Sequence, residues 1–443
     1  MFCIILGHRL FHTIIAGPSL NPNYLENGYT STMKMVVANG TGIVAIFFVI
    51  SGFLEARTMM TLNAKLPRFT ATFLLSHYAI RYVRLVPALA VALAIQTQWM
   101  QYMGSGPLWG QLVGKLTEDC QQNWWSHLLF INNYQGTFCM VQTWFLASVV
   151  QMFLLTPPLM WLVSRWTQRA LWPGCLLLGL LLAASAVVLY ATTVHLGLLP
   201  TWIMYPEALR HVNVATNPTF VYQYVRTHTN ALPYVVGLLA GALFYLANRD
   251  KWQPSKTVVT LLWLGIPFSL ALSFAIIFIG VVFNLPSFEA RPLLDALYGP
   301  ARLLGFSLPS AWIIFTCGMG HGGLFNSLLT WRPLVVMGRL TYSVYLMHLT
   351  FTIVATSSVR HPIYLSDYTI VSQTLSDIVV AYAVGLVLYF CVEAPMMNLQ
   401  TIAFTHWFRR KSGSAGQTAE RSLPDQPVQQ ARNVPANAVT TSM

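Results

Sequence analysis

Long apolar runs alternate with short polar segments along most of the chain. Ten of these runs are long enough to cross a bilayer, because a membrane-spanning helix needs about 20 mostly apolar residues. The runs cover residues 1–17, 40–56, 83–101, 141–163, 172–194, 231–248, 257–283, 302–319, 335–356 and 375–392. The pattern predicts an all-α, polytopic membrane protein with about ten transmembrane helices, which form one domain over residues 1–400.

Composition agrees with a protein surrounded by lipid. Of the 443 residues, 55% are hydrophobic and only 9% are charged, whereas a soluble chain carries about 25% charged residues. The net charge of +12 does not indicate a nucleic-acid partner, because the basic residues lie between the apolar runs and form no basic stripe. Residues 409–443 are rich in Ser, Gln, Ala, Asn and Pro, a composition typical of a disordered tail.

The distribution of basic residues predicts how the helices are oriented. If the N-terminus is cytoplasmic and the spans alternate, 17 Lys and Arg residues fall on the cytoplasmic side and seven on the other side, with Arg9 inside the first span. Cytoplasmic segments carry the excess of Lys and Arg, so both termini and the tail are expected in the cytoplasm. The first run begins at Met1 without a basic flank, and we interpret it as a helix that lacks its first turns. No signal selects the plasma membrane or an endomembrane.

The six cysteines do not predict a metal site, because none of them forms a Cys-x-x-Cys pair. Cys120 and Cys139 share one polar segment on the predicted non-cytoplasmic side. These two cysteines can form a disulfide if that segment faces an oxidising compartment.

Ionisable groups inside the apolar runs are costly to bury, so each is a candidate for function. His8 lies in the first run, and a neutral imidazole can accept a proton from a hydroxyl and return it to a leaving group. The alternative is a structural histidine that forms a hydrogen bond with a neighbouring helix. Ser51, in the second run, is a further candidate.

Basic and aromatic groups near other spans are also candidates. Arg81 and Arg84 stand three residues apart on one helical face, where they could bind phosphate groups or anchor the helix at lipid headgroups. Tyr342 and His348 could line the same cavity or connect helices. Glu393 is expected to meet a basic partner at a helix end.

Several sequence motifs follow one another along residues 1–400. They are ILGHRLF (5–11), FFVISGFL (47–54), RYVRLVPAL (81–89), TWFLASVVQMFLLTPPL (143–159), ALPYVVGLLAG (231–241), GHGGLFNSLLTWRPLVVMGRLTYSVYLMHL (320–349) and VEAP (392–395). In this order and combination they resemble the acyltransferase 3 superfamily, and in particular its animal branch of nose-resistant-to-fluoxetine proteins.

The resemblance implies an activity that moves an acyl group from acyl-coenzyme A to a hydroxyl of a lipid or carbohydrate. It places the catalytic histidine at His8, which would take the proton of the acceptor hydroxyl. The arginine pair of the family falls on Arg81 and Arg84, which would hold the phosphates of the donor. Ser51 would contact the reacting carbonyl. Membrane lipids, the acyl donor and the acceptor are the expected partners, with no metal and no tightly bound cofactor.

The chain departs from the family pattern at several positions. An arginine that precedes the catalytic histidine in the family would fall before Met1, and the cysteine-rich N-terminal domain of the animal branch has no counterpart in these residues. An acidic residue is replaced by Ala45, and a second is missing at Val149 and Val150. An arginine of the family is replaced by Asn230. Loss of the acidic groups would cost several kcal/mol of transition-state stabilisation, judged from such losses in other enzymes.

Three functions therefore remain open from the sequence. The first is a membrane-bound O-acyltransferase with His8 as its general base. The second is an uptake or transport protein for lipids or xenobiotics, which would tolerate the loss of the acidic residues better than an enzyme. The third is a catalytically inactive scaffold that descends from an acyltransferase.

Overall fold

The protein is almost entirely helical in the part of the chain that the structure describes. The computed structural model describes residues 1–15, 19–35, 39–65, 69–137, 139–200, 216–285 and 287–402. Within these ranges the β-structure is limited to an isolated bridge between Ser19 and Ile363. The predicted all-α class is confirmed. The predicted disordered tail at 409–443 lies outside the described residues.

Helices form at all ten predicted spans. The helices are α1 (Phe2–Ile15), α2 (Asn23–Tyr29), α4 (Val44–Lys65), α5 (Ala71–Ala94), α6 (Lys115–Leu128), α7 (Asn132–Gln135), α8 (Trp144–Thr167), α9 (Leu171–His195), α11 (Ala231–Arg249), α12 (Lys256–Ile279), α13 (Pro292–Asp295), α14 (Tyr298–Gly318), α15 (Gly323–Leu329), α16 (Arg332–Arg339), α17 (Thr341–Ser357) and α18 (Asp367–Leu388). Among the described residues, eight helical segments are long and apolar enough to cross a membrane. The other two predicted spans are α1, with 14 residues, and α17, with 17. The chain is therefore a multi-pass membrane protein.

Several predicted boundaries are wrong, and two of them have identifiable reasons. The span expected at 83–101 begins at Ala71, because the Thr70 hydroxyl accepts a hydrogen bond from the Phe73 amide at 3.2 Å and caps the helix. The span expected at 335–356 is divided between α16 and α17. Gly338 lies in the last turn of α16, where glycine weakens a helix.

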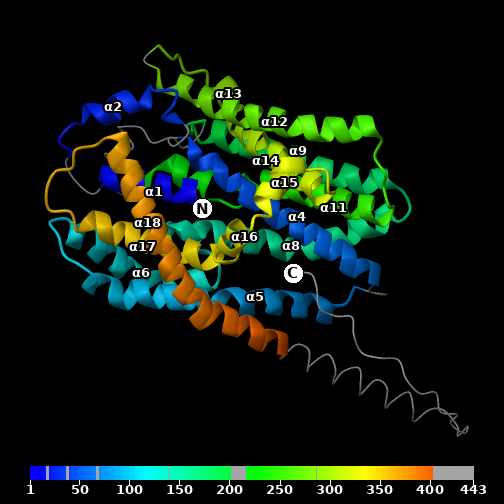
Figure 1. Cartoon of the computed structure of the whole chain (residues 1–443), viewed down its shortest axis with the longest axis horizontal. Coiled ribbons are helices and arrows are strands. Elements are labelled where there is room, and N and C mark those ends of the chain that lie inside the picture. Colours follow the sequence, from blue (N-terminus) through cyan, green and yellow to red (C-terminus); the bar gives the residue numbers. More distant parts are fainter. Residues whose placement is uncertain are drawn as a thin grey trace, which may run out of the picture.

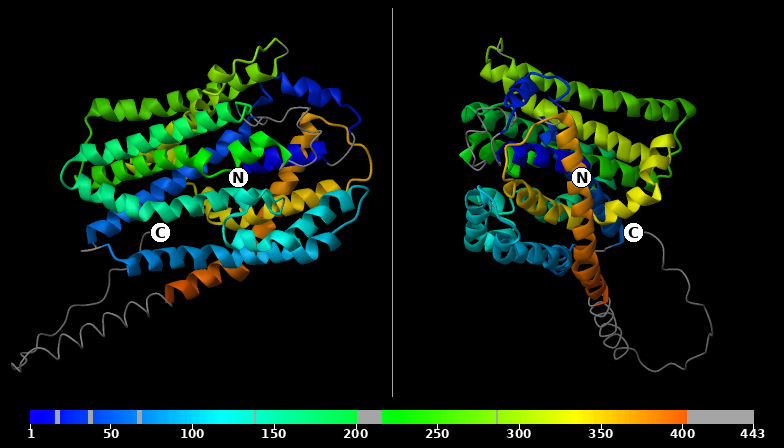
Figure 2. Two further views of the ribbon diagram at one scale, coloured as in Figure 1. Left: turned by 180° about the vertical axis from the view of Figure 1, so that it is seen from behind. Right: turned by 60° about the vertical axis from the view of Figure 1, so that its left-hand side comes forward.

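The long helices lie side by side with alternating direction. In Figure 1 the C-terminal end of α4 and the N-terminal end of α5 lie at the right, whereas α2 and the loop between α17 and α18 lie at the left. The further views in Figure 2 show the same bundle, with α18 crossing the other helices at a steep angle. Connections therefore gather at two opposite ends of the bundle, as expected for spans that alternate.

Two close contacts between backbones bring α4 and α11 together. A Cβ atom placed on Gly52 of α4 would lie well inside 3.0 Å of the Tyr234 carbonyl oxygen on α11. In the same way, a Cβ atom on Gly237 of α11 would meet the carbonyl oxygen of Val49. Small residues allow such close approach of helices in membranes. The FFVISGFL and ALPYVVGLLAG motifs are thus packing motifs for one helix pair.

Cys120 and Cys139, for which the sequence left a disulfide possible, form one in the structure. It ties α6 to the segment that precedes α8. The Asp119 carboxylate supports this junction, because it accepts hydrogen bonds from the Thr137 hydroxyl at 2.6 Å and the Cys139 amide at 2.7 Å.

A buried histidine beside this junction makes the stability of the fold depend on pH. The Nδ1 atom of His127 lies 2.8 Å from the hydroxyl of Thr143, which itself donates to the Met140 carbonyl oxygen. The His127 Nδ1–H group is therefore the donor to Thr143. Burial lowers the pKa of His127 from 6.5 to about 4, although the nearby Asp119 carboxylate opposes this shift.

Because the pKa of His127 is lower in the folded state, the unfolded chain takes up the proton first as the pH falls. We expect a loss of about 3 kcal/mol of stability from this group between pH 6.5 and pH 4. His127→Asn keeps a donor for Thr143 and should flatten the dependence of the melting temperature on pH over this range. The same substitution at His361, which is exposed, should leave it unchanged. If the melting temperatures of wild type and His127→Asn depended on pH in the same way, His127 would not be the group responsible.

Candidate functional site

The first helix brings His8 against a second predicted site residue, His348. Helix α1 packs against both α17 and α18. The ring centroids of His8 and His348 are 5.2 Å apart, and the rings are tilted by 55°. His8 is half-buried, whereas His348 is 1% exposed. The structure therefore joins the proposed catalytic histidine to a residue expected to bind substrate.

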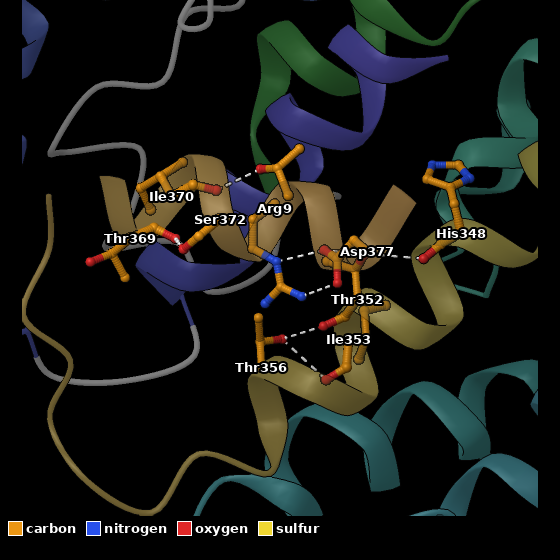
Figure 3. Close-up of polar contacts among 10 residues, drawn as sticks. Arg9, His348, Thr352, Ile353, Thr356, Thr369, Ile370, Ser372 and Asp377 are labelled. Carbon is orange, nitrogen blue, oxygen red and sulfur yellow. Dashed lines mark hydrogen bonds and ion pairs between the residues drawn. The ribbon is translucent and has the colours of Figure 1, made fainter. Parts of the chain in front are cut away.

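A buried ion pair holds α1 in this place. Figure 3 shows the Arg9 guanidinium of α1 reaching the Asp377 carboxylate of α18, to which it donates two hydrogen bonds. The one from Arg9 Nε to Asp377 Oδ2 measures 2.6 Å. The Thr352 hydroxyl of α17 lies 3.2 Å from Asp377 Oδ2 and 3.1 Å from the His348 carbonyl oxygen. Since Arg9 follows His8 directly, this network fixes the position of His8 relative to α17.

Arg81, the first member of the arginine pair, is engaged by a carboxylate. Its guanidinium Nη1 lies 3.5 Å from Glu55 Oε2, and the His77 Nε2 atom lies 2.8 Å from Glu55 Oε1. The guanidinium also stacks over the Phe153 ring, at 4.3 Å from its centroid. Glu55, His77, Arg81 and Phe153 thus form one cluster that connects α4, α5 and α8.

Arg84 and Tyr342 lie where α5 meets α17. Arg84 is exposed and is close enough to Tyr342 and Glu393 to interact electrostatically. The Tyr342 hydroxyl donates to the Leu85 carbonyl oxygen at 2.7 Å, so Tyr342 connects the two helices. Glu393 accepts a hydrogen bond from the Ser343 hydroxyl at 2.6 Å. Tyr342 and His348 are six residues apart on α17, which is about 9 Å along the helix.

The positions that lack the acidic residues of the family are part of the apolar interior. Ala45 is 2% exposed and Val149 is 3% exposed, and each belongs to a cluster of buried apolar side chains. Val150 packs against a third cluster. Asn230 donates from its side-chain amide to the carbonyl oxygens of Tyr224 and Arg226 at 2.7 and 2.8 Å. Ser51 is half-buried on α4, next to Gly52.

Sequence reasoning missed Glu55, Asp377 and the pairing role of Arg9. The signal that could have found them is a charged residue inside or at the edge of an apolar run, which needs a partner in a membrane. Among the described residues, no group of three or more His, Cys, Asp and Glu side chains could hold a metal ion.

The described residues form a bundle of apolar helices, typical of a multi-pass membrane protein, with a histidine on α1 and an arginine pair on α5. The model of the family described as "Acyltransferase domain" matches residues 1–393, so the chain belongs to this acyltransferase 3 family. The chain is 24% identical to "Nose resistant to fluoxetine protein 6" of Caenorhabditis elegans over 443 residues, which cover 95% of this chain and 52% of that protein. It is 25% identical to "Regulator of hypoxia-inducible factor 1" of the same organism over 378 residues, which cover 80% of this chain and 68% of that protein.

The resemblance to the nose-resistant-to-fluoxetine branch is thereby confirmed. The chain spans about half the length of the first of these relatives. No solved structure gives a significant match.

Proposed function

We propose that the chain is a membrane-bound O-acyltransferase that moves an acyl group from acyl-coenzyme A to a hydroxyl of a lipid or carbohydrate. The observation that supports this proposal most is the position of His8, which lies inside the bundle against His348 while Arg9 anchors its helix to Asp377. A half-buried imidazole held in this way is suited to act as a general base. The acyltransferase family of the chain supports the same reaction class.

In the proposed reaction, a lone pair on His8 takes the proton of the acceptor hydroxyl while its oxygen attacks the thioester carbonyl. The new C–O bond forms, the C–S bond breaks, and the proton passes from His8 to the thiolate of coenzyme A. Arg81 and Arg84 would hold the phosphates of the donor. The Glu55 carboxylate neutralises part of the charge of Arg81, so Arg84 would make the larger contribution. Ser51 would contact the reacting carbonyl.

We also propose that both termini of the chain lie on the cytoplasmic side of the membrane. The excess of Lys and Arg on that side supports this orientation. The disulfide between Cys120 and Cys139 lies on the opposite side in this arrangement, where an oxidising compartment would allow it to form.

The proposed reaction is tested with the purified full chain and a radiolabelled acyl-coenzyme A in lipid nanodiscs. We expect label to enter a lipid or carbohydrate acceptor, with a decrease of at least about 100-fold in His8→Ala. His361→Ala is the matched control, because His361 is exposed and lies in the loop before α18. Equal turnover in wild type and His8→Ala, or none in either, would contradict the proposal.

A carrier for lipids or xenobiotics, or an inactive scaffold, is the second candidate. The burial of Ala45 and Val149 among apolar side chains favours it, because these positions offer no carboxylate to a catalytic histidine. Movement of a lipophilic fluorescent probe across proteoliposomes, without any acyl donor, would support the carrier. If the protein neither transfers label nor moves the probe, the scaffold is favoured.

A further inference from the structure

The two ring nitrogens of His348 have different surroundings. The Nδ1 atom lies 2.8 Å from the Tyr345 carbonyl oxygen and 3.3 Å from that of Val344. Carbonyl oxygens only accept hydrogen bonds, so Nδ1 must carry the proton. The Nε2 atom of the neutral ring is then a bare acceptor. It is buried and has no hydrogen-bond partner among the described residues.

A buried acceptor without a partner is costly and calls for an explanation. The His8 ring is in place to supply one, because it contacts the His348 ring directly. His12, one turn further along α1, is also near enough to His348 to interact with it electrostatically. The ring centroids are 5.2 Å apart, so a nitrogen of His8 can come within hydrogen-bonding distance of His348 Nε2 when the two atoms face each other. The Arg9–Asp377 pair ties α1 to α18 at the residue next to His8.

We propose that His348 is the positioning residue of His8: its Nε2 atom accepts a hydrogen bond from the N–H group of His8. This inference rests on the proposed acyl transfer, in which His8 is the general base, and it identifies the residue that orients His8. The hydrogen bond selects the His8 tautomer in which the other nitrogen carries the lone pair and faces the acceptor hydroxyl. In hydrolases with a catalytic triad, a carboxylate has this role.

The arrangement accounts for the missing acidic residues. Ala45 and Val149 cannot supply a carboxylate, and they lie in apolar clusters. A neutral imidazole acceptor needs no counter-charge while His8 is neutral. When His8 takes the proton of the hydroxyl, its N–H bond to His348 becomes charge-assisted and stronger. The bond weakens again when His8 gives that proton to the thiolate sulfur of coenzyme A.

Two substitutions of His348 distinguish the roles of its two ring nitrogens. The amide of Asn reaches about the place of Nδ1, so His348→Asn keeps the donor to Tyr345 and removes the acceptor. The amide of Gln reaches about the place of Nε2, so His348→Gln retains an acceptor for His8. We expect kcat to fall about 100-fold in His348→Asn, with KM nearly unchanged. The kcat of His348→Gln should be at least about 10-fold higher than that of His348→Asn.

A second measurement does not depend on turnover. Diethyl pyrocarbonate modifies the nitrogen of a neutral histidine that carries the lone pair. Mass spectrometry measures the rate of this modification at His8 relative to that at the exposed His361 in the same molecule. We expect the relative rate at His8 to fall about 10-fold in His348→Asn and to return in His348→Gln. Elution of each variant as a monodisperse peak in size-exclusion chromatography establishes that it is folded.

The outcomes distinguish the inference from the proposed function. If wild type turns over and His348→Asn does so equally well, the role of His348 is wrong while acyl transfer stands. If wild type transfers no label, the proposed function is wrong, and the labelling of His8 alone decides whether the histidines are coupled. Equal labelling of His8 in all three proteins would overturn the coupling. If Asn and Gln reduce both measurements equally, His348 is only structural and the inference is also overturned.

Discussion

Gly237→Ala is expected to separate α4 from α11 and to destabilise the protein by about 3 kcal/mol, the upper end for overpacking in a close-packed core. The added methyl group would overlap the carbonyl oxygen of Val49, which belongs to a helix backbone and cannot rotate away. Gly52→Ala should act in the same way from the other helix, because its Cβ would meet the Tyr234 carbonyl oxygen. The measurement is the melting temperature in detergent, read from the monodisperse fraction that remains after heating.

The matched control is Gly179→Ala, which places the same methyl group in the middle of α9. Nothing lies within 4 Å of the added atom there. Alanine is the better helix former by about 1 kcal/mol, so this variant should match or slightly exceed the stability of wild type. If Gly237→Ala and Gly179→Ala have the same melting temperature, the close contact of α4 with α11 does not stabilise the bundle.

The second large effect is expected from breaking the ion pair of Arg9 and Asp377. Their exposed fractions are 5% and 8%, so removal of either partner leaves an uncompensated charge inside the bundle. We expect Arg9→Met or Asp377→Leu to cost about 3–5 kcal/mol each. The double variant should recover most of this loss, because replacing both partners by apolar residues leaves no buried charge.

A double-mutant cycle on thermal stability tests this prediction, since it isolates the coupling between the two side chains. Arg249 and Asp250 provide the comparison, because they form an exposed ion pair at the end of α11. Arg249→Met should change the melting temperature little. If the single and double variants at Arg9 and Asp377 were destabilised additively, the pair would not act as a unit.

The helical fold could be predicted from the sequence because the apolar runs are long and the polar segments between them are short. Helix ends were harder to place. The start of α5 depends on the Thr70 cap, and that of α18 depends on the Ser366 hydroxyl, which accepts from the Thr369 amide at 3.1 Å. Both caps lie in polar segments where hydropathy gives no signal.

These misplaced ends also explain which site residues were missed. The second predicted run ends at 56 and so places Glu55 at its edge, but α4 continues to Lys65 and Glu55 is buried in its middle. Asp377 stood near the start of its predicted run, but α18 begins ten residues earlier, at Asp367. His8 and His348 were singled out because histidine is rare at membrane depth. Their contact could not be predicted, since nothing in one sequence indicates which helices are neighbours.

The ion pair of Arg9 and Asp377 also has a consequence for synthesis in the cell. The two residues are 368 positions apart, so the ribosome needs roughly 20–70 s to reach the aspartate after it has made the arginine. During that time α1 carries a guanidinium with no counter-ion from α18. The insertion machinery or lipid headgroups must shelter the first helix until the last one arrives. Nascent chains that stop before α18 would therefore expose a charged helix to quality control, which makes completion of the chain a condition for stable insertion.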